Sequence, residues 1–254
     1  MLIKTGFVLS RLPSSLLAIA LASCQPTAEI QTTPPARSPL AAPTSPTPSA
    51  ADITQASRYR QEGLSARQQG NFPQAIAALE KSVQLDPTHL SGYVILGWTQ
   101  HLAGQATAAT TTLQTALQRD PNHVPALNAL GIVYLVNGQL EQAVATHTQA
   151  AQLQPNNEIA YYNLSLAYQR LQQYGRAIET AIKATQLEPE NPHPWVALAI
   201  AHWSKGDRSS AQTAYTRAIE LDSGYGDHAY LSHLKEAGFS PDQIQLTEQV
   251  LRAD

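Results

Sequence analysis

The sequence predicts an all-α protein in which five helical pairs stack in a row and a further helical pair follows them. Three observations predict this fold class. The chain repeats itself every 34 residues without an insertion from Ala56 to Tyr225, small residues recur at fixed places, and proline recurs near the end of four of the five repeats. A helical pair leaves an apolar face that it cannot bury alone, so neighbouring pairs stack into a solenoid.

The first residues of the chain predict a cleaved signal peptide over residues 1–23. Lys4 and Arg11 precede an apolar stretch over residues 12–22, which is shorter than the roughly 20 residues that span a bilayer. The stretch ends in the letters LASC, whose last residue is Cys24. This pattern resembles the lipobox of bacterial lipoproteins. An ordinary secretory signal or an uncleaved anchor is the alternative.

The lipobox resemblance implies that the thiol of Cys24 carries a diacylglycerol and that its amine carries a further chain such as palmitate. A second chain matters because a single acyl chain binds a membrane only reversibly. Residues 24–55 then form a tether from the lipid to the folded part. Seven of the 17 prolines lie between Gln25 and Ala50, and so few large apolar residues occur there that burial cannot offset the entropy of ordering.

The repeats divide into units 56–89, 90–123, 124–157, 158–191 and 192–225. Alanine occupies one place in all five units, and a small residue occupies a second place seven residues later, which lets the two helices of a unit approach closely. A third column of small residues lies in the first helix. The three columns are Ala75, Ala109, Ala143, Ala177 and Ala211; Ser82, Ala116, Ala150, Ala184 and Ala218; and Gly63, Gly97, Gly131, Ser165 and Ala199.

Glycine and proline mark where the helices end. Gly70, Gly104, Gly138 and Gly206 stand where the first helix must turn, since glycine takes a positive φ freely. Pro87, Pro121, Pro155 and Pro189 stop the second helix, and Ser223 takes the fifth place. In the fourth unit Gln172 replaces the turn glycine, with Gly175 nearby, which predicts a differently shaped turn.

These columns resemble the tetratricopeptide repeat (TPR) family over about two thirds of the chain. The resemblance implies a right-handed α-solenoid of five TPR helix-turn-helix units. Residues 226–254 are predicted to form a C-terminal capping helical pair over the open end, because Ser240 and Gln243 read as a capping box. A docking helix is the alternative for this segment.

The TPR resemblance also implies a binding groove on the first helices, which receives extended or helical segments of other proteins. The family's lining positions fall on Arg60, Leu64, Arg67, Val94, Trp98, His101, Asn128, Ile132, Leu135, Tyr162, Leu166, Gln169, Arg170, Val196, Ile200 and Trp203. This lining is mostly apolar and lacks the Lys/Asn clamp with which some members hold a terminal carboxylate. The alternative is that these side chains only pack against the next repeat.

Composition and motifs argue against other classes of protein. A net charge of −3 without a run of Lys or Arg argues against nucleic acid as a partner. The lone cysteine excludes an intramolecular disulfide and a multi-thiolate metal site. The eight histidines form no HExxH pattern, and no phosphate loop or GxSxG occurs. We therefore expect no enzyme, no catalytic residues, no metal site and no cofactor.

The sequence thus predicts a membrane-anchored adaptor or scaffold that binds proteins, placed on the outer membrane facing the periplasm or on the cell surface. Lipoproteins of this size with tandem TPR units resemble the pilotins of type IV pili, and they also resemble adaptors for cell-wall hydrolases. Both alternatives stay open, as do the client's identity and the oligomeric state.

Overall fold

A computed structural model describes residues 47–253 of the chain. The predicted signal peptide, Cys24 and the greater part of the predicted tether lie outside the described residues. Among the described residues no helix is both long and apolar enough to cross a membrane.

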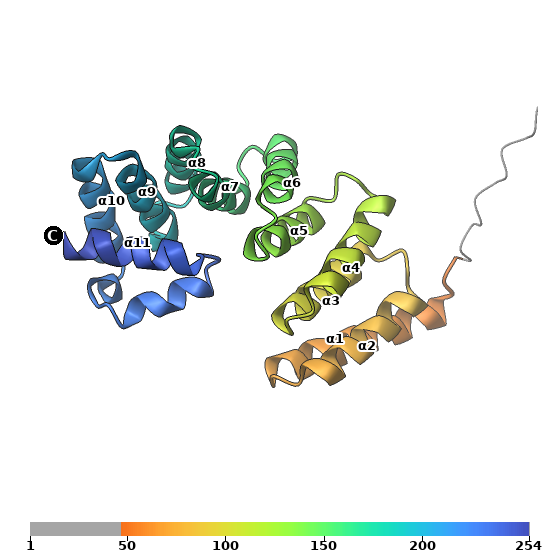
Figure 1. The fold of residues 1–254 in the computed structure, drawn as a ribbon. Coiled ribbons are helices and arrows are strands. Elements are labelled where there is room, and N and C mark those ends of the chain that lie inside the picture. Colours follow the sequence, from red (N-terminus) through yellow and green to blue (C-terminus); the bar gives the residue numbers. More distant parts are fainter. Residues whose placement is uncertain (1–46, 254) are drawn as a thin grey trace, which may run out of the picture. The chain divides into compact units, whose positions relative to one another are not determined.

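Ten consecutive helices form the five predicted pairs, and a C-terminal segment follows (Figure 1). The first helices are α1 (Ala50–Gln68), α3 (Leu90–Leu102), α5 (Val124–Val136), α7 (Glu158–Arg170) and α9 (Pro192–Lys205). The second helices are α2 (Phe72–Leu85), α4 (Ala106–Arg119), α6 (Leu140–Leu153), α8 (Tyr174–Leu187) and α10 (Arg208–Leu221). The predicted all-α fold of five stacked helical pairs is therefore confirmed.

Helix α1 begins earlier than the repeat register predicts. Residues 50–55, placed in the tether by the sequence, are helical. Ser49 caps this helix by accepting from the Asp52 backbone amide, and the Asp52 carboxylate accepts from the Ser49 amide in return. This capping box satisfies two amides that a helix start leaves free, so the helix extends back to Ala50.

The small-residue columns lie where the two helices of each unit meet. All five alanines of the first column are fully buried, and the residues of the second column are at most 1% exposed. In the third column, a β-carbon built on Gly63 or Gly97 would lie 2.6 Å from Leu79 Cγ or Leu113 Cγ. The equivalent β-carbon on Gly131 would lie 2.4 Å from His147 Nε2. Large side chains of the second helices therefore occupy the space that the missing β-carbons leave.

The turn of the fourth unit differs from the prediction. Gln172 adopts φ +59°, the left-handed conformation that glycine supplies in the other four units. The Gln172 amide donates to Gln169 O, and the following amide donates to Tyr168 O. In unit three, the amides of Gly138 and of the residue after it make the equivalent two hydrogen bonds. The turn therefore keeps its shape, and the substitution leaves backbone strain of about 1 kcal/mol at Gln172 instead.

The acidic residues before the prolines end the second helices and start the next turn. Asp86, Asp120 and Asp222 each accept a hydrogen bond from the backbone amide two residues later. The first helix that follows is capped by His89, His123, Asn157 or Asn191, whose side chains accept from backbone amides. These side chains therefore form hydrogen bonds within the connections between repeat units.

The C-terminal segment differs from the predicted α-helical pair. Two short 3-10 helices, η1 (Ser223–Gly226) and η2 (Tyr230–Lys235), precede a single α-helix, α11 (Pro241–Arg252). The Ser240–Gln243 capping box is present at the start of α11. Between successive units each first helix packs more against the preceding second helix than against the preceding first helix, whereas α11 packs more against α9 than against α10. The segment therefore turns back along the first helices, and we call residues 227–253 the C-terminal arm.

Candidate functional site

A pocket of about 810 Å³ opens on the first helices of units two to four. We call it the groove pocket. It is lined by Trp98, His101 and Leu102 of α3, Ile132 and Val136 of α5, Ile159, Tyr162 and Asn163 of α7, and residues 235–238 of the C-terminal arm. Leu102, Val136 and Ile159 are 47%, 48% and 40% exposed, which is unusual for large apolar side chains. The pocket thus presents an apolar floor to solvent.

The aromatic side chains of the groove pocket are held in place by their neighbours. The Trp98 ring lies 5.1 Å from the His101 ring and packs partly against the buried core. Burial lowers the pKa of His101, so its imidazole is neutral at pH 7. A neutral His101 adds no charge to the floor, which suits an apolar occupant better than a charged one.

Tyr162 closes one end of the groove pocket. Its hydroxyl donates to Ala237 O of the C-terminal arm at 2.6 Å, and its ring lies 6.2 Å from the Phe239 ring. Burial raises the pKa of Tyr162 well above its usual value, so the phenol stays protonated and can donate. The arm therefore forms the wall where the pocket ends toward units four and five.

The groove residues predicted in the first unit and at Asn128 make contacts within the protein. Arg60, Leu64 and Arg67 are half-buried, and Arg60 Nη1 donates to Ser82 Oγ at 3.4 Å. Asn128 and Asn157 exchange two amide hydrogen bonds of 3.2 and 3.0 Å, which join α5 to the start of α7. Asn128 therefore stabilises the contact between units three and four.

The apolar groove residues predicted at Leu135 of unit three and in units four and five lie around the C-terminal arm. Leu135, Leu166, Val196 and Ile200 are fully buried in the core cluster that also contains Leu231, Leu234, Phe239 and Val250 of the arm. These four predicted groove residues are therefore closed to a partner in this arrangement. Val94 is half-buried against the same cluster.

The polar groove residues of units four and five contact the arm or lie beside it. The Gln169 side-chain oxygen accepts from Gln243 Nε2 at 2.9 Å, and Arg170 Nη1 donates to Leu135 O at 2.6 Å. The guanidinium of Arg208 lies 3.4 Å from the centre of the Trp203 ring. Burial lowers the pKa of Arg170, and the nearby Asp242 carboxylate opposes that shift.

Sequence reasoning missed three of the apolar residues on the groove-pocket floor. Leu102 and Val136 occupy the same place in the 34-residue register as Arg170, which the prediction included. Ile159 occupies the second place of its unit, a lining position in the TPR family. The 34-residue register therefore places all three residues at lining positions of the groove. The arm's share of the pocket had no such signal, because residues 235–238 lie outside the repeat.

The polar clusters of the described residues give no metal centre. No group of three or more His, Cys, Asp or Glu side chains within residues 47–253 could hold a metal ion. His228 and His233 both serve the arm: Arg252 Nε donates to His228 Nε2 at 3.2 Å, and Tyr225 Oη lies 3.0 Å from His233 Nε2. The chemistry available in the groove pocket is therefore apolar contact with a few hydrogen bonds.

Stacked helical pairs with a groove along their first helices define an α-solenoid, a class of fold that offers extended surfaces to binding partners. Residues 65–220 match the family model described as the N-terminal TPR repeats region of Psidin. Since the match covers more than half of the chain, the protein belongs to the TPR family.

Solved structures with the same fold include MamA proteins. A crystal structure of MamA has a TM-score of 0.59 at 25% identity, covering 66% of this chain and 92% of MamA. MamA from Desulfovibrio magneticus RS-1 has a TM-score of 0.61 at 25% identity and covers 66% of this chain and 96% of its own. The thermophilic TPR protein TTC0263 of Thermus thermophilus has a TM-score of 0.55 at 22% identity, covering 66% of this chain and 92% of TTC0263. This similarity shows the fold alone. No curated protein matches the chain.

Proposed function

We propose that the protein is an adaptor that binds an apolar helical or extended segment of another protein in the groove pocket. The observation that carries the proposal is the cluster of exposed apolar side chains, Leu102, Val136 and Ile159, on three successive first helices. Family membership supports it, since TPR solenoids use such surfaces for binding. The half-buried Trp98 beside these residues supplies the aromatic contact common at binding hot spots.

The geometry of the groove pocket favours a helical occupant. Leu102 and Val136 end two successive first helices at equivalent places, and Ile159 lies near the start of the next one, so the three side chains offer separate anchoring points on neighbouring helices. An amphipathic helix presents apolar residues every three or four positions and can meet such points with one face. Lys235 and Glu236 at the rim are both exposed and of opposite charge, so they can meet polar residues on the helix's other face.

Val136→Glu is expected to abolish partner binding at the groove pocket, because it places a charge on the apolar floor. A photo-reactive residue at Leu102 should cross-link a discrete partner in living cells, and Val136→Glu should reduce that product at least about 10-fold. Leu153→Glu is the matched control, since Leu153 is 41% exposed on α6, outside the pocket. Equal loss in both variants, or equal cross-linking from Gln118 on α4, would contradict the proposal.

We further propose that the adaptor is held on a membrane by lipid at Cys24. The support is the sequence around Cys24: two basic residues, a short apolar stretch and the LASC motif that resembles a lipobox. Mass spectrometry of the mature amino terminus should find residues 1–23 removed and two or three acyl chains on Cys24. Cys24→Ser should shift the protein from the membrane fraction to the soluble fraction, and an unmodified Cys24 in the natural protein would refute the anchor.

Two kinds of client fit a lipid-anchored adaptor of this build. A pilotin-like role predicts that deletion removes secretin multimers from the outer membrane, whereas an adaptor for cell-wall hydrolases predicts altered sensitivity to lysis. The apolar groove pocket suits either client, because each would be bound through a short segment.

A further inference from the structure

The C-terminal arm contains two parts that are attached to the first helices in different ways. The part before α11 is fixed by apolar packing: Leu231 and Leu234 are fully buried and Phe239 is 3% exposed. The three buried residues of α11 are Gln243, Thr247 and Val250, of which two are polar. Ile244, Leu246 and Leu251 of α11 also pack against the core but stay half-buried. Since apolar burial provides most of the stability of a packed helix, α11 is less firmly held than the part before it.

Helix α11 depends on the side chain of Gln243 for its contact with α7. Gln243 Nε2 donates to Leu166 O at 3.1 Å and to Gln169 Oε1 at 2.9 Å. Its Oε1 accepts from the Ser240 amide at 3.0 Å. One amide group, 1% exposed, thus joins α11 to the first helix of the fourth unit.

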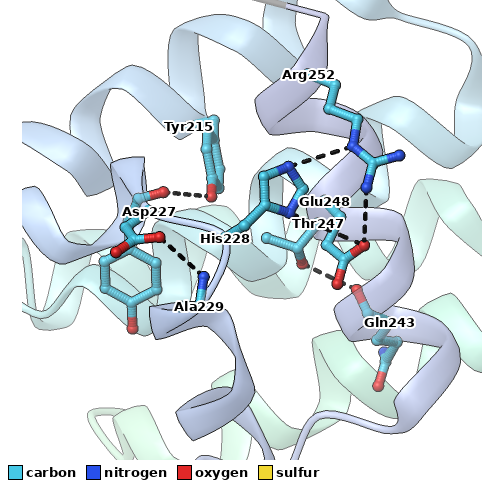
Figure 2. Close-up of polar contacts among 9 residues, drawn as sticks. Tyr215, Asp227, His228, Ala229, Gln243, Thr247, Glu248 and Arg252 are labelled. Carbon is cyan, nitrogen blue, oxygen red and sulfur yellow. Dashed lines mark hydrogen bonds and ion pairs between the residues drawn. The ribbon is translucent and has the colours of Figure 1, made fainter.

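The far end of α11 combines the buried Val250 with exposed polar contacts. Arg252 Nε donates to His228 Nε2, and the Glu248 carboxylate lies 3.6 Å from Arg252 Nη2 and 4.0 Å from His228 Nδ1 (Figure 2). Gln212 Nε2 of α10 donates to Ala253 O at 2.6 Å. Exposed ion pairs of this kind contribute little to stability because water competes for both partners.

Helix α11 also leaves part of the surface beside it uncovered. An open pocket of about 920 Å³ runs along α11, lined by Gln169, Arg170 and Trp203 on one side and by Asp242, Gln243 and Leu246 on the other. Side chains that border an open space lack the close contacts of a packed interior. A helix with longer side chains at these places contacts more of this surface than α11 does.

We infer that α11 is a displaceable ligand of its own protein, and that an amphipathic helix of another protein takes its place on units four and five. The competing helix carries an amide or hydroxyl donor at the place of Gln243, to satisfy Leu166 O, and larger apolar residues toward Trp203. The chain opens at Ser240, directly before α11, while η2 and Phe239 stay packed. The inference goes beyond the proposed function, since this surface adjoins the groove pocket but is covered by α11.

The test uses the full chain with Gln243→Ala and a fluorescent peptide of residues 238–253 in its natural sequence. Loss of the Gln243 hydrogen bonds should raise amide hydrogen exchange in α11 about 10-fold or more, while exchange in α9 stays unchanged. The peptide should then bind the variant at least about 10-fold more tightly than the unaltered chain, because the site is vacated.

Gln245→Ala is the matched control, because Gln245 lies on α11 but is exposed. It should leave both exchange and peptide binding as in the unaltered chain. The inference is overturned if α11 opens and the peptide binds no better, or if α11 and α9 exchange together, which would make α11 an integral part of the fold. The Leu102 cross-link is a separate readout, so its failure would reject the groove-pocket function and leave this inference standing.

Discussion

Replacing His147 by leucine is expected to raise the free energy of unfolding at pH 7 by about 2 kcal/mol and to flatten its decline in acid. His147 is fully buried, and neither ring nitrogen has a partner in good hydrogen-bond geometry among the described residues, although the Gly131 backbone lies close enough to raise its pKa. It occupies the place in the third unit that Leu79 and Leu113 occupy in the first two, against Gly131. Leucine therefore fits this site and removes an unsatisfied polar group.

The acid response follows from the direction of the pKa shift. Burial lowers the pKa of His147 to about 3, an effect that the Gly131 backbone only partly offsets. The unfolded chain binds the proton near pH 6.5, so stability is full above that value and falls as the pH drops toward 3. The loss that this one group contributes between pH 7 and pH 3 is about 4 kcal/mol.

Urea unfolding between pH 7 and pH 3.5 measures both effects. The His147→Leu variant should lose much less stability over this range than the unaltered chain does. Leu113→His is the reciprocal variant, since it puts a buried imidazole opposite Gly97, and it should add acid sensitivity. Parallel pH profiles for the unaltered chain and His147→Leu would show that His147 finds a partner or water that satisfies it.

Gly97→Ser is expected to lower the free energy of unfolding by about 2 kcal/mol, because the new β-carbon would lie 2.6 Å from Leu113 Cγ. The fourth unit shows how the repeat accommodates a serine: Ser165 stands opposite Ala181, and both are buried. Adding Leu113→Ala should therefore relieve the overlap. The double variant should be at least about 1 kcal/mol more stable than the sum of the two single losses predicts.

Urea unfolding of the four chains in this double-mutant cycle measures the coupling. Gly175→Ser controls for the change from glycine to serine in a helix, since a β-carbon at Gly175 meets nothing within 4 Å. That variant should be neutral or slightly stabilised. Additive losses at positions 97 and 113 would mean that Leu113 moves aside freely and that close approach at Gly97 is unimportant.

Most of the repeat could be predicted from the sequence because one period sets several columns at once. Ala75 or Gly97 alone says little, but their equivalents 34 residues apart predict which surfaces meet, and burial confirms the alanine column. The same register predicts the places of Leu102, Val136 and Ile159. The early start of α1 was also readable, since Ser49 and Asp52 have the spacing of a capping box.

The arm could not be predicted because nothing repeats there. Gln243 was readable as part of a capping box, but its bond to Leu166 O joins residues 77 apart in sequence. Leu135, Leu166, Val196 and Ile200 carried the pattern of an open groove, and only the tertiary fold shows that they are buried. Gln172 likewise keeps a glycine's conformation because the helices on both sides fix the turn.

The two ends of the Gln243 amide have a consequence for how α11 behaves once it leaves its site. Its oxygen caps the start of α11, and its nitrogen holds α7. A helix of 12 residues is marginal in water, so a detached α11 loses its helical form as well as its contacts. If α11 is displaced as inferred above, its folding and docking are one cooperative event, and a competing helix leaves residues 241–253 as an unstructured tail.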